Sequence, residues 1–232
     1  PTHAVSGSVP GFFRRMAQSR NGLTWYEEYS EKVPPEKQEG FKNFFDGFGR
    51  TLAKLSSDNK TKNTPVYNAC IISGQVLPSH DPALLERCIT LFFQKVQATK
   101  KEMEDAEKFI EWGKAGYFSG ITAQVHSLRE HVIKGFDDKM EEVRDFISKM
   151  FKKEETPSTR VLNNFAMVVT IYSLISEKLD LPVRVPALID FVYDRIIDQT
   201  NCVKGAEEIS DWWNSIEKKK KKGELTDDYC KV

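Results

Sequence analysis

The sequence predicts an α/β domain followed by a mostly α-helical part. Up to about residue 98, short apolar runs rich in β-branched and aromatic residues alternate with helical patterns. From Thr99 onward, apolar residues recur at helical spacing and strand signals are few. The chain of 232 residues is long enough to bury a substantial core.

Composition and charge exclude several classes of protein. Apolar residues make up 40% and charged residues 29% of the chain, which excludes a disordered or collagen-like protein. The 34 Lys and Arg residues balance 34 Asp and Glu residues, which excludes a globally basic nucleic-acid binder. The longest apolar stretches, 69–72 and 166–171, are far shorter than the ~20 residues that cross a bilayer. We expect a cytoplasmic protein with no membrane segment.

The first elements each have a sequence signal. Residues 9–20 carry apolar side chains at helical spacing, which predicts a short helix. An Asn-Gly turn signal precedes a strand at 23–27. A second helix opens at Pro34-Pro35 and ends at Gly47, because proline favours the first helical turn and glycine the position after the last.

Further strands are predicted in the next forty residues. Residues 50–56 and 64–73 predict a hairpin, and its second arm, VYNACIIS, is apolar enough to be central in a sheet. Asp81 is placed to cap a short helix that extends to Glu86. The run CITLFF predicts a strand at 88–93. Strand, helix and strand in this order fit an α/β sheet.

The rest of the chain predicts a series of helices. Gly135, Thr156-Pro157 and the segment from Pro182 to Pro186 are the natural boundaries between them. The predicted helices span residues 99–115, 119–134, 136–152, 158–179, 186–202 and 205–219.

The four cysteines do not predict a disulfide framework or a zinc site. Cys70, Cys88, Cys202 and Cys230 lie far apart, with no Cys-x-x-Cys pair and no histidine at zinc-finger spacing. We expect packed thiols.

Two adjacent acids are the first candidate functional residues. Glu27 and Glu28 follow an apolar strand, the arrangement in which nucleotide hydrolases hold a Mg²⁺-bound water and polarise the attacking water. The alternative is a strand that runs into a solvated acidic loop. A second apolar strand ending in IISGQ follows, and then a short helix with Arg87 at its end.

This ordered series resembles the latter half of an AAA+ ATPase core, in which Walker B, sensor 1 and arginine finger follow in that order. ALLERCITLFF is similar to the finger segment of the clade that includes the minichromosome maintenance and superfamily 3 helicases. WYEEYS, FFDGFGR, IISGQVLPSHDPALLERCI and RVLNNFAMVVT resemble the carboxyl-terminal half of primase-helicase proteins of bacterial mobile elements and phages. The resemblance covers most of residues 8–232 and is densest at 22–93.

The resemblance implies roles for five residues. Glu28 matches the Walker B glutamate that activates water, and Glu27 stands where the metal-linked aspartate usually stands, reaching Mg²⁺ through its water shell. Gln75 matches the sensor 1 position, with Ser73 as the neighbouring candidate. Arg87 matches the arginine finger, which in a ring reaches the phosphate held by the adjacent subunit. The alternative for Arg87 is a helix-end arginine that pairs with Glu86 or with the helix dipole.

The predicted hairpin carries the candidate DNA-binding residues. In the resembled helicases, a hairpin before sensor 1 projects into the central pore and grips the DNA backbone. Basic side chains suit this task because phosphate contacts dominate affinity without reading sequence. The alternative is a solvated turn. The candidates are Arg50, Lys54, Lys60 and Lys62.

The resemblance divides the chain into three parts. Residues 1–98 correspond to the core from Walker B to the arginine finger, and residues 99–202 correspond to a helical lid. Residues 203–232 resemble the start of a winged-helix module, in which a helix and basic stretch precede a β-arm. The alternative for this tail is an amphipathic helix that packs Trp212 and Trp213 and ends in a solvated lysine run.

The sequence contains no GxxxxGK[ST] phosphate loop and begins at Pro1. We therefore expect a fragment of an ATP-dependent DNA helicase, inactive alone, whose phosphate loop lies upstream. The resemblance implies ATP and Mg²⁺ as cofactors, single-stranded DNA as partner, and a homo-oligomeric ring, expected to be a hexamer. One alternative is a non-hydrolysing DNA-binding or assembly module with a degenerate AAA+ fold. Another is a helical interaction domain whose motif resemblances are accidental.

Overall fold

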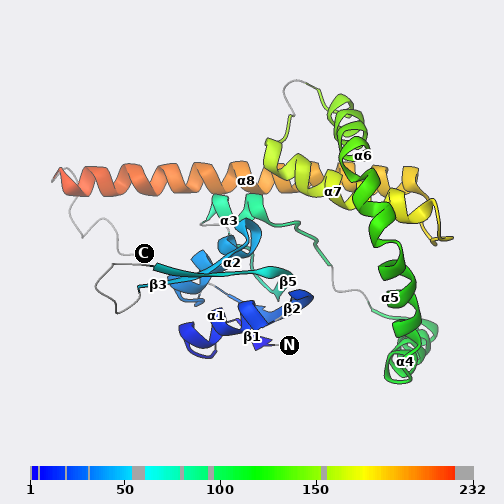
Figure 1. Ribbon diagram of the computed structural model, residues 1–232. Helices are drawn as coiled ribbons and strands as arrows, with labels where there is room; N and C mark the ends of the chain where they lie inside the picture. Colours follow the sequence, from blue (N-terminus) through cyan, green and yellow to red (C-terminus); the bar gives the residue numbers. More distant parts are fainter. Residues whose placement is uncertain are drawn as a thin grey trace. The chain divides into compact units, whose positions relative to one another are not determined.

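The computed structural model describes residues 2–4, 6–18, 20–30, 32–53, 61–78, 81–93, 97–152 and 156–222. The chain divides into two compact units, Pro1–Cys88 with Thr200–Val232, and Ile89–Gln199. The first unit is α/β and the second is helical (Figure 1). The further division that we expected, into core, lid and winged-helix start, stays a prediction. The elements are β1 (Thr2–His3), α1 (Val9–Gln18), β2 (Arg20–Tyr29), α2 (Pro35–Asp46), β3 (Phe48–Ala53), β4 (Thr61–Pro65), β5 (Tyr67–Gly74), α3 (Pro82–Arg87), α4 (Lys100–Lys114), α5 (Tyr117–Ser127), α6 (Arg129–Met150), α7 (Thr159–Ser176) and α8 (Val185–Lys221).

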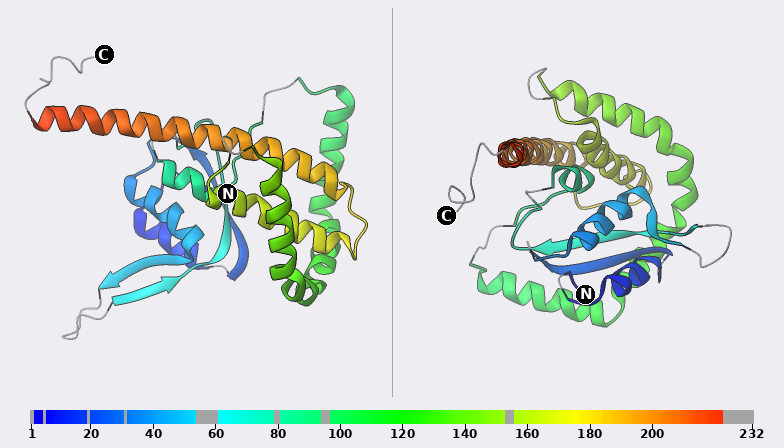
Figure 2. Two further views of the ribbon diagram at one scale, coloured as in Figure 1. Left: turned by 90° about the horizontal axis from the view of Figure 1, so that it is seen from above. Right: turned by 90° about the vertical axis from the view of Figure 1, so that its left-hand side faces the viewer.

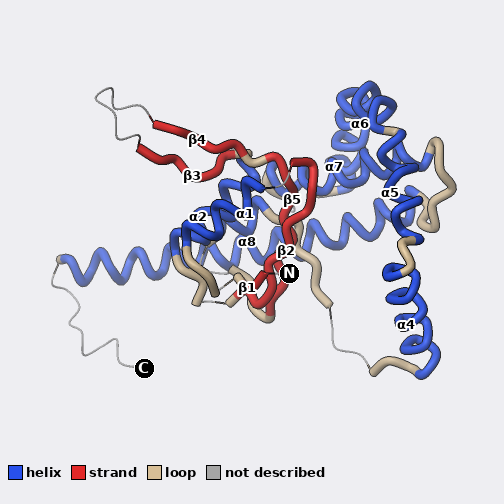
Figure 3. The backbone as a smooth tube through the Cα atoms, turned by 60° about the horizontal axis from the view of Figure 1, so that its bottom comes forward, coloured by secondary structure: helices blue, strands red, loops and turns tan. Residues whose placement is uncertain are grey.

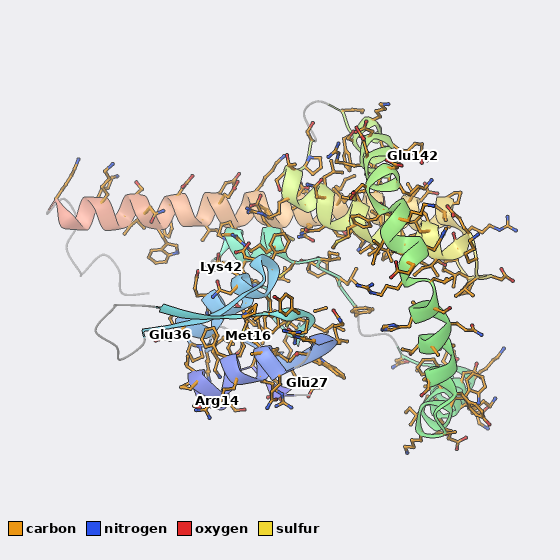
Figure 4. The ribbon with its side chains drawn as sticks, in the orientation of Figure 1. Arg14, Met16, Glu27, Glu36, Lys42 and Glu142 are labelled. Carbon is orange, nitrogen blue, oxygen red and sulfur yellow. The ribbon has the colours of Figure 1, made fainter. Side chains whose placement is uncertain are left out.

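A parallel sheet with the strand order β1-β2-β5 organises the first unit. Helices α1 and α2 cover one face, where the rings of Phe12, Tyr26 and Phe41 lie 5.0–5.3 Å apart. Figure 4 shows Met16 on the sheet side of α1 and Arg14 on its outer side, as the helical spacing predicts. Burial of these aromatic rings contributes to the hydrophobic stabilisation of this face.

The other face of the sheet is not covered by any element within the described part of this unit. Leu23, Trp25, Tyr67 and Ile71 point to it and are 45–58% exposed. The register places Trp25 beside Ile71, so the apolar side chains form neighbouring rows.

The predicted boundaries of α2 are confirmed. Pro35 lies in the first helical turn, and Gly47 ends the helix with a left-handed φ of 72° that a side chain would disfavour. Asp81 caps α3 as predicted, because its carboxylate accepts a hydrogen bond from the Leu84 N–H at 3.0 Å.

The prediction for the hairpin is partly wrong. Its second arm is β4, which pairs with β3 in antiparallel register, with Leu52 opposite Lys62. Residues 67–74 instead leave the hairpin and become β5, an edge strand of the described parallel sheet rather than a central one. The chain changes sheets at Val66, which is buried and donates its N–H to the Gly47 carbonyl at 3.0 Å. Figures 2 and 3 show β3 and β4 projecting from the sheet of this unit.

The predicted strand at 88–93 is also wrong. These residues form no ladder with any described strand, and the Thr90 N–H is satisfied by the Gln199 side chain at 2.9 Å. A run of β-branched and aromatic residues forms a strand only where the backbone of a neighbouring strand offers hydrogen bonds. Ile89, Leu91, Phe92 and Phe93 remain 38–90% exposed.

In the helical unit, α4 and α7 match the predicted ranges. The predicted division at Gly135 is wrong, because the break lies at Leu128 and α6 continues through the glycine. A Cβ at Gly135 would approach a Leu174 methyl group to 2.9 Å, so this glycine allows α6 to pack closely on α7. The core of the unit is formed by α6, α7 and the first turns of α8, around Ile147, Phe165 and Ile196.

The predicted break between 202 and 205 is wrong as well, because α8 continues through Gly205. A glycine in a helix costs only ~1 kcal/mol, and its neighbours Val203 and Ala206 are buried beside Leu85. The predicted β-arm at 223–232 lies outside the described residues. Among the helices that the structure describes, none is long and apolar enough to cross a membrane.

Candidate functional site

The carboxyl ends of β2 and β5 meet at one edge of the sheet. The two strands run parallel with Tyr29 opposite Gly74, so Glu27, Glu28 and Gln75 all lie at this edge. The sequence predicts that strands at 23–27, 66–73 and 88–93 share one sheet, with Glu28 and Gln75 at the same edge. This prediction is confirmed for the first two strands and is wrong for 88–93. Ligands of open α/β sheets bind at such an edge.

The two strands approach unusually closely at their ends. A Cβ at Gly74 would lie 2.5 Å from the Tyr29 carbonyl oxygen and 2.9 Å from the Tyr29 Cβ. Only glycine fits here without a shift of the backbone. The close approach of β2, which carries Glu27 and Glu28, therefore requires a glycine at position 74, directly before Gln75.

The neighbouring acids differ in backbone and exposure. Glu28 is exposed and has a φ of 58°, within a register irregularity between Tyr26 and Tyr29. Glu27 is half-buried, and its carbonyl accepts a hydrogen bond from the Ala4 N–H at 2.6 Å. A non-glycine residue with positive φ costs roughly 1–2 kcal/mol, and such strain is concentrated at functional sites.

The structure distinguishes between Ser73 and Gln75, the two candidates for the sensor 1 position. The Ser73 hydroxyl accepts a hydrogen bond from the Trp25 indole at 3.1 Å, so it is engaged on β2. Gln75 follows the last residue of β5 and is exposed at the edge. Gln75 is the better placed of the two to meet a ligand.

The side chain of Arg87 contacts residues of α2 and α3 in its own chain. Its guanidinium donates to the Ala83 carbonyl at 3.0 Å and lies 3.5 Å from the Asp46 carboxylate. The ring of Phe45 lies beneath it, 6.0 Å from the guanidinium carbon. Asp46 is followed by Gly47, whose carbonyl oxygen accepts a hydrogen bond from the Val66 N–H. Val66 comes directly before β5, so the contact between Arg87 and Asp46 lies toward the amino end of β5. The described contacts of Arg87 are thus with α2 and with its own helix α3.

A second link between α2 and α3 was not predicted from the sequence. The Lys42 ammonium contacts Glu39 at 2.6 Å and Asp81 at 3.2 Å. Hydrogen bonds to Glu39 and Asp81 raise the pKa of Lys42, although its partial burial opposes this shift. The spacing of Glu39 and Lys42 on one helix was a usable signal, but nothing in the sequence pointed to Asp81.

A buried lysine was not predicted from the sequence either. Lys37 is 1% exposed, and its ammonium donates to the carbonyl oxygens of Ala4 and Ser6 at 3.1 and 2.8 Å. Burial lowers the pKa of Lys37. Because Ala4 also bonds to Glu27, Lys37 anchors the segment that flanks the acidic edge.

The candidate DNA-binding residues belong to the projecting hairpin. Arg50 lies on β3 and Lys62 on β4, with side chains outside the described part. Lys54 and Lys60 lie outside the described residues altogether. Within the residues that the structure describes, no group of three or more His, Cys, Asp or Glu side chains could hold a metal ion.

Comparison with known proteins adds no relative: no protein-family model and no curated protein matches this sequence.

Proposed function

We propose that this chain is the carboxyl-terminal half of an AAA+ helicase domain, from a protein that moves along DNA in mobile-element or phage replication. The observation that carries the proposal is the parallel pairing of β2 and β5, which brings Glu27, Glu28 and Gln75 to one edge. The projecting hairpin between these strands and the short helix after them follow the order that the sequence resemblance implies.

In this proposal, the attacking water and the terminal phosphate of ATP bind at the edge of the sheet where β2 and β5 end. Glu28 would orient the attacking water, Glu27 would hold Mg²⁺ through its water shell, and Gln75 would contact the phosphate. Two carboxylates and an amide are a donor set that suits a hydrated magnesium ion and a phosphoryl group. The phosphate loop must come from outside these 232 residues, because the sequence has no such motif.

In this proposal, the site is shared between subunits. Arg87 contacts Ala83 and Asp46 in its own chain, and the arginine finger that the resemblance implies would come from a neighbouring subunit. A ring, expected to be a hexamer, supplies that neighbour at every site. The hairpin residues Arg50, Lys54, Lys60 and Lys62 then contact single-stranded DNA through its phosphates.

The second candidate function is a DNA-binding or assembly module that has lost hydrolysis. Glu27 in place of the usual aspartate favours it. The ion pair between Arg87 and Asp46 favours it as well, because an arginine finger must leave its own chain to reach a neighbouring phosphate.

Mixing two inactive variants of the natural full-length protein tests the proposal. Glu28→Gln should keep ATP binding but lose hydrolysis, because the carboxylate acts on the water and not on the phosphates. Arg87→Ala should lower the hydrolysis rate by about 10³–10⁵-fold. Rings mixed from both variants contain some sites with Glu28 from one chain and Arg87 from another.

Partial recovery of ATPase activity on mixing, with subunit exchange shown by fluorescence transfer, supports the shared site. No recovery despite exchange contradicts it. A wild-type full-length protein that binds DNA without hydrolysing ATP would instead establish the second candidate.

A further inference from the structure

The last turns of α8 extend beyond the packed part of their unit. Val203 and Ala206 are buried with Leu77 and Leu85, and they are the last residues of the helix in a described core cluster. After Ala206, every residue whose side chain the structure describes is exposed, except the half-buried Ile216. In Figure 1, this segment is the orange and red end of the helix. About four turns of helix are thus folded without an interior of their own.

This free end carries an apolar face. Ile209, Trp212, Trp213 and Ile216 recur at helical spacing and lie on one side of the helix. Trp212 and Trp213 are 59% and 54% exposed, and their rings lie 5.0 Å apart at 71°. The alternative given for this tail, a helix that packs both rings, does not describe them, because more than half of each side chain is exposed. Each of them presents ring surface to solvent.

Charge is separated along the same segment. Glu207, Glu208 and Asp211 precede the tryptophans, and residues 218–222, which follow Glu217, are all lysine. Lys218, Lys219 and Lys222 are exposed. From Trp213 to Lys222 the helical rise is ~14 Å, so the ring surface and the cationic end lie within reach of one short strand of nucleotides.

We propose that the Trp212–Trp213 pair and the lysine end of α8 form a binding site for single-stranded nucleic acid. Exposed indole rings stack on unpaired bases, and neighbouring lysines contact phosphates and release counterions. A duplex hides the base faces, so a single strand is the form that uses both features. The site requires neither ATP nor the acidic edge of the sheet, and it is independent of the proposed ATPase function.

The charge pattern favours a nucleic acid over an anionic membrane. A membrane-surface helix lies along the bilayer with cationic side chains flanking its apolar face. Here the acids Glu207, Glu208 and Asp211 flank the start of that face, where an anionic surface would repel them. A nucleic-acid strand can cross the helix at its lysine end and avoid these acids.

A binding titration on the whole 232-residue chain tests the site. The probe is a fluorescein-labelled oligothymidylate, and its anisotropy is measured over a range of salt concentrations without nucleotide. The Trp212→Ala/Trp213→Ala variant removes stacking, and the Lys218→Gln/Lys219→Gln/Lys222→Gln variant removes phosphate contacts. The matched controls are Trp112→Ala, because Trp112 is 51% exposed in the other unit, and Lys100→Gln/Lys101→Gln, which changes two exposed lysines.

We expect the tryptophan variant to bind at least about fivefold more weakly. The lysine variant should lower the slope of log affinity against log salt by up to about 2. Both controls should bind like the wild-type chain. Thermal unfolding should stay unchanged in all variants, because the substituted side chains lie outside the described core clusters.

Three results would overturn the proposal. One is equal affinity of the tryptophan variant and the wild-type chain for the oligonucleotide. Another is tighter binding to phosphatidylcholine–phosphatidylserine vesicles than to the oligonucleotide, which would assign the site to a membrane. The third is loss of self-association in the tryptophan variant with no change in oligonucleotide binding, which would assign the face to a second copy.

Discussion

Arg87 and Asp46, the last residues of α3 and α2, form an ion pair across the two helix ends at 3.5 Å. Asp46 lies at the negative end of its helix dipole, where a carboxylate is unfavourable, and the guanidinium offsets this charge. Arg87 therefore has a structural partner that the sequence did not suggest.

A double-mutant cycle with Asp46→Asn and Arg87→Gln measures this pair. Both side chains are partly exposed, so solvent screens the interaction and we expect a coupling free energy below about 1 kcal/mol. The coupling in urea unfolding should shrink further at high salt. A coupling free energy of several kcal/mol that does not change with salt concentration would contradict a partly exposed ion pair.

Gly74→Ala should lower the free energy of unfolding by about 1–3 kcal/mol. The added methyl group would meet the Tyr29 backbone, and β2 and β5 would have to separate at the candidate site. Gly120→Ala is the matched control, because nothing lies within 4 Å of that position in α5. The control should be neutral or more stable by up to about 1 kcal/mol. Equal effects at both positions would contradict the close approach.

Glu28→Gly and Glu28→Ala both remove the carboxylate, but only glycine relieves the positive φ at this position. The glycine variant should therefore be more stable than the alanine variant by about 1 kcal/mol. Chemical denaturation of the two variants checks this difference. An alanine variant as stable as the glycine variant would show that residue 28 does not adopt the left-handed conformation.

Lys37→Met should lower the free energy of unfolding by about 1–3 kcal/mol, because the carbonyl oxygens of Ala4 and Ser6 lose a buried donor. Lys32→Met is the control, because Lys32 is exposed, and it should change stability by less than about 0.5 kcal/mol. Amide hydrogen exchange should also speed up at Ala4 in the Lys37 variant. Unchanged exchange there would contradict the anchoring role.

The partly buried thiols of Cys70 and Cys88 predict a loss of stability at alkaline pH. Burial, with a smaller effect of Cys88, raises the pKa of Cys70 to about 12. Burial, with a smaller effect of Asp81, raises the pKa of Cys88 to about 11. The folded state thus keeps these protons while the unfolded chain loses them above about pH 9, so stability is complete below pH 9 and falls above it.

Urea unfolding between pH 8 and pH 11, values that bracket the usual thiol range, measures this loss. A Cys70→Val/Cys88→Val variant should show a flatter decline. Tyr29, whose pKa burial raises to about 12, still contributes to the decline in that variant. Rapid alkylation of Cys70 and Cys88 by iodoacetamide at pH 8 in the folded protein would contradict their burial.

The sequence by itself determined the elements with strong local signals. Pro35 and Gly47 bound α2, Asp81 caps α3, and Thr99 begins α4 with a reciprocal capping box, because these signals act within one helical turn. The order of apolar strands also predicted that Glu28 and Gln75 share an edge, since parallel strands end together.

Only the tertiary structure decided the features that depend on a distant partner. Residues 88–93 have the composition of a strand but no neighbouring strand among the described residues, and Gly135 permits close packing against Leu174 where a helix break was predicted. Arg87 pairs with Asp46, which lies 41 residues away in the sequence. Periodicity and capping report the conformation of a single segment, whereas strand pairing, close packing and ion pairs depend on which segments meet in space.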